Sequence, residues 1–359
     1  MLVVFAALAL LLAVADPQPW SRYRAWMQGP TLAGLLGLLV AIQGVRDSGL
    51  VQRAAWAMVV RAHSVRTLGL LLVAASALLS MALTNDVSLF LIVPLTLALG
   101  ALCNLPVLRM VVLEALAVNA GSTLSPIGNP QNLLLWQHSA LSMAQFAWAM
   151  APAFAVMLML VLLLAWAWLP AHRVSITPTP TTAPAPAIGL GVCSALGLAF
   201  MVLAMEYGHA GWGAAAVLAA GALLAGDSLR RVDWGLLLTF AAIFIALGHL
   251  AELAWVQHVM VALDLHRPGM LYASGVIASQ ALSNVPATVL LLDRAPDVMA
   301  LATAVNVGGF GLVTGSLANL IALRLARQPH GLRVFHQVSI PFLLVCAPLV
   351  YLAQRVLGA

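Results

Sequence analysis

Long runs of apolar residues, separated by short polar breaks, extend along almost the whole chain. The longest, such as 146–169 and 336–357, reach the roughly 20 residues that a helix needs to cross a bilayer. Others, such as 287–292 and 298–307, are too short to cross alone. The first run, 2–15, lacks the basic start of a signal peptide, so we expect it to stay as a helix. The pattern predicts an all-α polytopic membrane protein.

Composition removes several alternatives. Hydrophobic residues make up 63% of the 359 residues and charged residues 8%, whereas a soluble domain carries about 25% charged residues. All 16 basic residues are Arg, and they are spread over the predicted loops without the basic patch of a nucleic-acid-binding protein. The sequence has no activated nucleophile, acid pair or metal-ligand cluster. We therefore expect neither an enzyme nor a bound cofactor, and no nucleic-acid partner.

A Pro- and Thr-rich segment divides the chain near its middle. Residues 170–187 have no apolar period and predict an extended linker. It separates a first repeat half, 1–169, from a second, 188–359. The loops 46–66 and 324–335 carry several Arg residues each and are expected on the cytoplasmic side. We predict a multi-pass membrane protein, with the lipid bilayer as its surroundings.

The two halves share a pattern of residues. NAGSTLSPIGNPQNLL at 119–134 aligns without gaps with NVGGFGLVTGSLANLI at 306–321. Upstream, LTNDVSLFLIVPL at 83–95 matches LSNVPATVLLL at 282–292. The paired positions are Asn119 with Asn306, Gly121 with Gly308, Gly128 with Gly315, Asn132 with Asn319, and Thr84-Asn85 with Ser283-Asn284. Such repeats with interrupted hydrophobic segments are typical of secondary transporters.

Each half contains a segment that cannot form a continuous helix. Gly121, Pro126, Gly128 and Pro130 fall within the first, and the corresponding stretch 306–319 is rich in Gly. Gly and Pro at this density break a helix, and a second short helix should begin near Pro130. Because unsatisfied backbone groups cannot face lipid, each break must be buried in protein or line a wet cavity.

Each half also has a polar tip between apolar runs, at 84–86 and at 283–284. Ser, Thr, Asn and Asp are preferred N-cap residues, so a helix beginning at each tip directs its positive end there. Helix N-termini suit an anion, whereas unwound carbonyls suit Na⁺. We predict two repeats, inverted or parallel, with re-entrant hairpins near 67–103 and 270–292 and unwound helices near 106–138 and 298–325.

One acid lies inside the first tip. Asp86 sits between apolar runs, and an ionisable group at membrane depth is costly and by default functional. Its counterpart is Val285, so the two halves are not equivalent. Glu114 is a weaker candidate, because it can instead pair with Arg109 or lie near an interface. His249 lies within a predicted span, where we expect a hydrogen-bonded structural role rather than a relay.

At these motifs the sequence resembles the ion transporter superfamily. This contains divalent anion/sodium symporters, citrate transporters, arsenite permeases and a sodium/proton antiporter branch. PIGNPQN at 126–132 looks most similar to small bacterial inner-membrane anion-permease-like proteins. The resemblance covers most of the chain from the second helix onward. It implies a multi-pass protein of a bacterial inner (plasma) membrane, built from two inverted-topology repeats. It also implies Na⁺ sites between each tip and the adjacent unwound stretch, a substrate between the two tips, and often a homodimer.

The resemblance assigns residues by position. It places the first cation site at Thr84, Asn85, Asn119, Gly121 and Gly128. It places the second at Ser283, Asn284, Asn306, Gly308 and Gly315. Substrate contacts are expected from Asn85, Ser122, Asn129, Asn284 and Thr314, and proton or cation coupling from Asp86.

The tips depart from the Ser-Asn-Thr tips of the dicarboxylate carriers. A dianion would be repelled by Asp86 unless that acid is protonated. We expect a permease or symporter for a small anionic or weakly acidic solute, coupled to Na⁺ or H⁺. A sodium/proton antiporter and an arsenite-type extruder of an uncharged solute are alternatives with the same fold. A non-transporting structural membrane protein is a third alternative.

Overall fold

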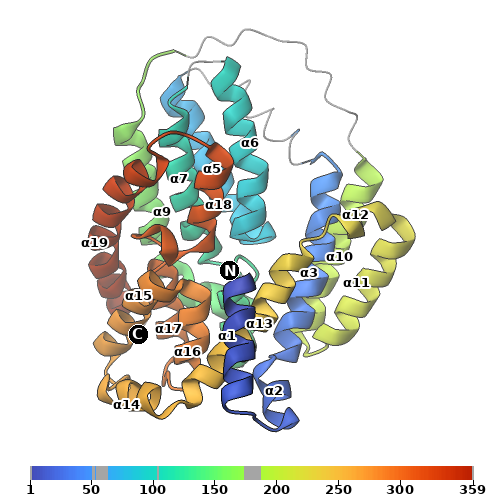
Figure 1. The fold of residues 1–359 in the computed structure, drawn as a ribbon. Helices are drawn as coiled ribbons and strands as arrows, with labels where there is room; N and C mark the ends of the chain where they lie inside the picture. Colours follow the sequence, from blue (N-terminus) through green and yellow to red (C-terminus); the bar gives the residue numbers. More distant parts are fainter. Residues whose placement is uncertain (1, 51–52, 54–63, 103–104, 174–186, 358–359) are drawn as a thin grey trace.

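The computed structural model describes residues 2–50, 53, 64–102, 105–173 and 187–357, and these residues contain α-helices and no strand (Figure 1). In that part of the chain, six helices are long and apolar enough to cross a membrane. They are α3 (Gly29–Asp47), α5 (Val65–Leu83), α9 (Met143–Trp168), α10 (Ile188–Glu206), α13 (Trp234–Glu252) and α19 (Gly331–Leu357). The prediction of an all-α polytopic membrane protein is confirmed to that extent.

The other helices are shorter or lie between these six. They are α1 (Leu2–Ala15), α2 (Trp20–Trp26), α6 (Asn85–Leu102), α7 (Val107–Ser122), α8 (Pro130–Ser139), α11 (Ala210–Leu224), α12 (Gly226–Arg230), α14 (Ala254–Ala262), α15 (Pro268–Leu282), α16 (Asn284–Leu292), α17 (Val298–Val307) and α18 (Leu317–Ala326), with a 3₁₀ turn η1 (Val313–Gly315). Helices α16 and α17 have 9 and 10 residues, about half of what a span requires.

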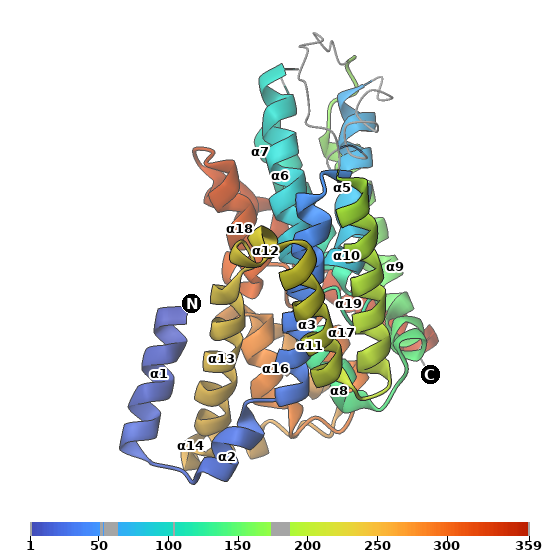
Figure 2. The ribbon, with the colours of Figure 1, turned by 90° about the vertical axis from the view of Figure 1, so that its right-hand side faces the viewer.

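The two sequence halves interleave in space. Helix α3 of the first half packs between α10 and α11 of the second, and α1 lies along α13 at the edge of the molecule (Figure 2). Helix α9 packs against α19 in the same way. The division of the chain at its middle is therefore not a boundary between two bodies. Most of the predicted linker, 174–186, lies outside the described residues.

Two helix pairs each turn at a single residue. Thr84 joins α5 to α6, and Ser283 joins α15 to α16. Both have nearly the same positive φ, 81° and 79°, which is costly for residues with a Cβ and is kept only where the surroundings impose it. The α5–α6 pair lies in the upper part of Figure 1 and the α15–α16 pair in the lower part.

Both predicted helix breaks are present. Helix α7 ends at Ser122 and α8 begins at Pro130, where the Oδ1 of Asn129 accepts a hydrogen bond from the Asn132 amide at 2.8 Å. The second break separates α17 from α18 and contains η1. Pro at the first helical position and Asn as the cap explain the restart of the first helix.

Two glycines let each broken helix approach the first helix of its neighbouring pair. A Cβ on Gly121 would collide with the backbone of Ala77 on α5. A Cβ on Gly308 would lie 2.5 Å from the Cβ of Ser279 on α15. Side chains at these positions would force the helices apart, so the glycines are required for close packing rather than for a special backbone conformation.

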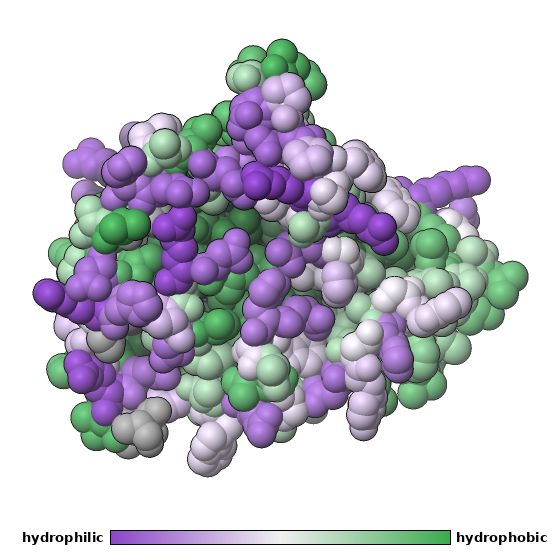
Figure 3. All heavy atoms as spheres, turned by 90° about the horizontal axis from the view of Figure 1, so that it is seen from below, coloured by the Kyte–Doolittle hydropathy of each residue, from purple (hydrophilic) through white to green (hydrophobic). Residues whose placement is uncertain are grey.

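Polar and apolar surfaces are separated as a bilayer requires. Hydrophilic side chains spread over the end of the molecule that lies at the bottom of Figure 1, as Figure 3 shows. Along α10, by contrast, large apolar side chains are exposed, among them Leu196 (65%) and Phe200 (50%). Exposed apolar area of this extent on helices of spanning length indicates contact with lipid.

Candidate functional site

The two tips meet across one small cavity, here called the tip cavity. Asn85 and Asp86 line it from the start of α6, and Ser283 and Asn284 from the start of α16, while α8, α13 and α18 supply the remaining walls. Its volume is about 30 Å³. Since about 10–15 Å³ suffices for a water, the cavity as it stands holds a small ion or a water or two, but no polyatomic carboxylate.

The tips present helix N-termini to this cavity. The Oδ1 of Asn85 accepts from the Asp86 amide at 2.9 Å, and the Oδ1 of Asn284 accepts from the Val285 amide at 3.0 Å. Each carboxamide is thereby held at the start of its helix, and its Nδ2 is left to donate elsewhere. The Asn85 amide donates to the Gly128 carbonyl at 2.8 Å, which joins the first tip to the first break.

Several buried polar atoms at the tip cavity have no hydrogen-bond partner among the described residues. They are the Oδ1 of Asp86, the Nε2 of Gln131 and the Oγ of Ser316, with the Oγ1 of Thr84 beside them in the first tip. Buried polar groups are nearly always hydrogen-bonded. Their concentration around one cavity marks it as the place in the described structure best suited to a polar ligand.

The asparagines of the two breaks bond to each other crosswise. The Nδ2 of Asn119 donates to the Oδ1 of Asn319 at 2.8 Å. The Nδ2 of Asn306 donates to the Oδ1 of Asn132 at 2.6 Å. Each pair therefore joins a residue of one sequence half to the other half, and the two pairs are related by the alignment of the halves.

The same amides make further hydrogen bonds, some of them within their own halves. Asn119 and Asn306 each donate to the carbonyl four residues earlier, on Ala115 and Ala302. Asn129 donates to the Oδ1 of Asn306 at 3.0 Å and to the hydroxyl of Ser122 at 3.0 Å. We call these buried carboxamides the asparagine cluster, which consists of Asn119, Asn129, Asn132, Asn306 and Asn319. The cluster holds the two breaks together, because buried polar groups without water must hydrogen-bond to one another.

The second break is also held from outside the cluster. The Nε2 of Gln280 donates to the Gly308 carbonyl at 2.7 Å, and its Oε1 accepts from the Leu312 amide at 2.8 Å. Thr314 is exposed and donates to the Gln280 carbonyl at 2.7 Å. Thr314 therefore braces the break and does not line the tip cavity, and its predicted contact with the substrate stays a prediction.

The predicted site residues divide into those at the tip cavity and those behind it. Asn85, Asp86, Ser283 and Asn284 line the cavity. The other predicted residues that the structure buries behind it are Thr84, Asn119, Gly121, Ser122, Gly128, Asn129, Asn306, Gly308 and Gly315. The members of each predicted cation site lie near one another, and cation binding there stays a prediction.

Three polar residues that line the tip cavity were not predicted from the sequence motifs: Gln131, Thr239 and Ser316. Ser316 is the position aligned with Asn129, so the alignment contained a signal for it. Thr239 lies on α13, outside both motif pairs, and nothing in its surrounding sequence singles it out.

Two other polar residues that the sequence singled out, Glu114 and His249, do not line the tip cavity and bond to residues outside it. The carboxyl group of Glu114 accepts a hydrogen bond from the Thr96 hydroxyl, while Arg109 donates to the Trp168 carbonyl at 3.1 Å. Of the two structural alternatives for Glu114, the pairing with Arg109 is therefore not formed. The Nε2 of His249 lies 3.3 Å from the Oδ2 of Asp16, as expected for a hydrogen-bonded structural residue.

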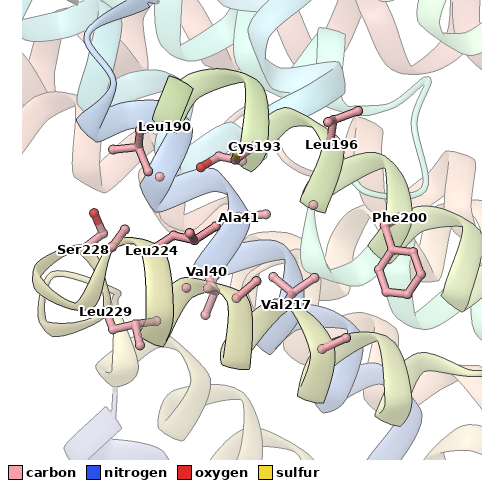
Figure 4. A pocket seen from close by; sticks show the side chains of 17 residues that line it. Val40, Ala41, Leu190, Cys193, Leu196, Phe200, Val217, Leu224, Ser228 and Leu229 are labelled. Atoms are coloured by element: carbon pink, nitrogen blue, oxygen red, sulfur yellow. The ribbon is translucent and has the colours of Figure 1, made fainter. Parts of the chain in front are cut away.

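A larger cavity lies elsewhere, between α3, α10 and α11 (Figure 4). Its volume is about 350 Å³, and side chains such as Val40, Leu196 and Phe200 make its lining almost entirely apolar. A polar solute finds few partners in such a groove. The tip cavity therefore stays the candidate site.

The chain is similar to known membrane proteins and transporters. The model of a family described as "Citrate transporter" matches residues 1–298. The chain is 43% identical over 344 residues to inner membrane protein YbiR of Escherichia coli, covering 96% of this chain and 91% of the relative. It is 29% identical over 331 residues to the uncharacterized transporter MJ0456 of Methanocaldococcus jannaschii, covering 91% and 88%.

A shorter match has a more specific description. The silicon efflux transporter LSI3 of Oryza sativa is 31% identical over 122 residues, which cover 33% of this chain and 25% of that protein. The match to the family model extends over far more than half of the chain. This multi-pass membrane protein is a transporter and belongs to the citrate transporter family.

Proposed function

We propose that the protein is a secondary active transporter that moves a small anionic or weakly acidic solute across a bacterial inner membrane, coupled to H⁺ or Na⁺. The solute binds between the two tips. The observation that carries the proposal is the meeting of two helix N-termini, with their asparagine carboxamides and one acid, at a single buried cavity. Helix N-termini favour negative charge, and the carboxamides can donate hydrogen bonds to it.

The proposed architecture is a pair of inverted repeats with re-entrant hairpins. Three observations support it: the equal φ of Thr84 and Ser283, the crosswise bonds of the asparagine cluster, and the helix pairs in opposite parts of Figure 1. Transporters with such repeats work by moving one body against another around a fixed site. Here α13, which carries Thr239, forms the facing wall of the tip cavity.

The small cavity fits an occluded state of this cycle. About 30 Å³ is too little for a citrate-sized solute, so the tips and α13 must separate for a solute to enter. Asp86 is 7% exposed and forms no ion pair among the described residues. A carboxylate facing an anionic solute here is repulsive, so the role proposed for Asp86 is to take up a proton, or a cation, together with the solute.

A sodium/proton antiporter is the second candidate. The cavity volume favours it, because an ion and a water fill the tip cavity as it stands. Arsenite-type extrusion of an uncharged solute is a third candidate, and the description of the rice relative as a silicon efflux transporter agrees with export. The coupling ion, not the fold, separates these candidates.

Ligand-induced stabilisation of the purified protein tests the proposal. Citrate and smaller mono- and dicarboxylates are added with and without Na⁺ at pH 6 and pH 8, and the unfolding temperature is measured. A ligand that binds only the native protein raises its stability in proportion to RT ln(1 + [L]/Kd). A shift that requires a carboxylate supports anion transport. A shift with Na⁺ or Li⁺ alone, larger at pH 8, contradicts it and supports the antiporter.

A further inference from the structure

A second buried acid lies in the first half, away from the tip cavity. Glu114 is fully buried on α7, and the hydroxyl of Thr96 on α6 donates to its Oε1. Its Oε2 has no hydrogen-bond partner among the described residues. The residues around it on α7, Val111, Leu113 and Ala115, are also fully buried. The acid therefore sits at the contact between two packed helices, in apolar surroundings.

No cation in the described structure offsets a charge on Glu114. The charged and titratable groups on α7 and the helices packed against it are Arg66 on α5, Asp86 on α6, Arg109 on α7, Arg324 on α18, and Arg333, His336, Cys346, Tyr351 and Arg355 on α19, while α9 and α17 carry none. None of them forms an ion pair or a hydrogen bond with Glu114 in the described residues. An isolated buried carboxylate is strongly destabilising.

The surroundings also exclude a metal or sodium ion as the compensating charge. Among the described residues, the Thr96 hydroxyl is the only side-chain oxygen that forms a hydrogen bond with the Glu114 carboxyl group. Na⁺ sites in transporters draw on several carbonyl and side-chain oxygens, and the helical backbone of α7 around Glu114 is continuous from Val107 to Ser122. A proton needs only one carboxyl oxygen, so it is the ligand that the geometry can hold.

Glu114 is connected to both parts of the site. Along α7 it precedes Asn119, which reaches across to Asn319. Thr96 lies on α6, the helix that begins at the first tip. The aligned positions in the second half are Leu301 and Ala295, so the acid and its hydroxyl partner belong to the first half alone.

We propose that Glu114 is a proton-binding site, distinct from Asp86, that is occupied while α6 and α7 are packed against each other and is emptied when they separate and admit water. In the transport cycle, binding and release of this proton couple the position of α6, which begins at the first tip, to the position of α7, which ends at the first break. That role rests on the proposed transport function, whereas the presence of the proton does not. The proton is therefore tested without any transported solute.

Infrared spectroscopy of the purified, reconstituted protein reports protonated carboxyl groups through their carbonyl stretch. We expect a band at pH 7 that Glu114→Gln removes and that Asp227→Asn, a change at an exposed surface acid, retains. Thr96→Val should shift the band because the hydroxyl donor is lost, and Thr96→Ser should restore its position. An unchanged spectrum in Glu114→Gln contradicts the proposal.

A parallel measurement separates this proposal from the transport proposal. Asp86→Asn is recorded in the same series, and a band lost only in that variant assigns the proton to Asp86 and contradicts a proton on Glu114. Stabilisation by citrate is then compared in the wild type and Glu114→Gln at pH 6 and pH 8. Retained stabilisation with an altered pH dependence supports the role in the cycle. No stabilisation in the wild type refutes citrate as solute and leaves the infrared result to decide on Glu114.

Discussion

Replacement of Asn306 by alanine tests the asparagine cluster most sharply. The Nδ2 of Asn306 donates to the Oδ1 of Asn132 at 2.6 Å and to the Ala302 carbonyl at 2.7 Å. Its Oδ1 accepts from the Nδ2 of Asn129 at 3.0 Å and, more weakly, from the Thr123 hydroxyl at 3.4 Å. The alanine removes all four bonds at a position that is 2% exposed.

The cost follows from which partners lose their last bond. Asn129 still donates to Ser122, and Thr123 still donates to the Asn119 carbonyl. The Oδ1 of Asn132 keeps no partner among the described residues, because its other bonds involve only Nδ2. One orphaned buried acceptor costs about 1–3 kcal/mol, and the lost bonds add about 1 kcal/mol. We therefore expect a destabilisation of about 2–4 kcal/mol.

Reversible unfolding in mixed micelles, followed by tryptophan fluorescence, measures this change. A double-mutant cycle with Asn132→Ala should give a coupling energy of about 0.5–3 kcal/mol, since each single change already removes the hydrogen bond between the two residues. The mirror pair Asn119 and Asn319, joined at 2.8 Å, provides a matched cycle that should behave alike. A cost below about 0.5 kcal/mol for Asn306→Ala, or additive single changes in both cycles, refutes the account of the cluster.

Three further changes test other parts of the structure. Gly121→Ala should destabilise the protein by about 1–3 kcal/mol through overpacking, because the new Cβ collides with the Ala77 backbone. In the control Gly211→Ala the new Cβ meets nothing within 4 Å, so the same unfolding assay should show no destabilisation. Thr96→Val should cost about 1–3 kcal/mol, since it leaves a buried carboxyl oxygen of Glu114 without its donor; equal stability to the wild type contradicts this bond. Asp86→Asn should flatten the pH dependence of solute uptake into proteoliposomes, and an unchanged profile removes Asp86 from proton coupling.

Local breaks in the helices were predictable from the sequence because their causes are local. The restart of a helix at Pro130 and its capping by Asn129 follow from the fixed φ of proline and the capping preference of asparagine. These features depend on a few adjacent residues and little on the rest of the fold.

Contacts between segments far apart in sequence were not predictable in the same way. The alignment pairs Asn119 with Asn306 and Asn132 with Asn319. The hydrogen bonds instead join Asn119 to Asn319 and Asn306 to Asn132. Sequence likeness shows which positions are equivalent and does not show which of them touch. The bond of Thr314 to Gln280 was not predictable for a similar reason, because it depends on the packing of α15.

The helices that enclose the site carried the weakest signal. Apolar runs such as α3, α10 and α11 satisfy the bilayer whatever their neighbours are, so their sequences do not indicate that they pack together. Thr239 on α13 lines the tip cavity for this reason without any motif to mark it. The separation of Glu114 from Arg109 likewise depends on the Trp168 carbonyl, which only the packing of α9 brings near.

The central claim is that solute binds between the two tips, and one measurement tests it most directly. The added carboxylate that stabilises the wild type most is titrated into the wild type, Asn85→Ala and Asn284→Ala. Ser194→Ala, in the apolar cavity between α3, α10 and α11, serves as the control. The shift in unfolding temperature is recorded for each protein. We expect both tip variants to fold and to lose the ligand-induced shift, while the control keeps it. A full shift in both tip variants contradicts a binding site at the tips.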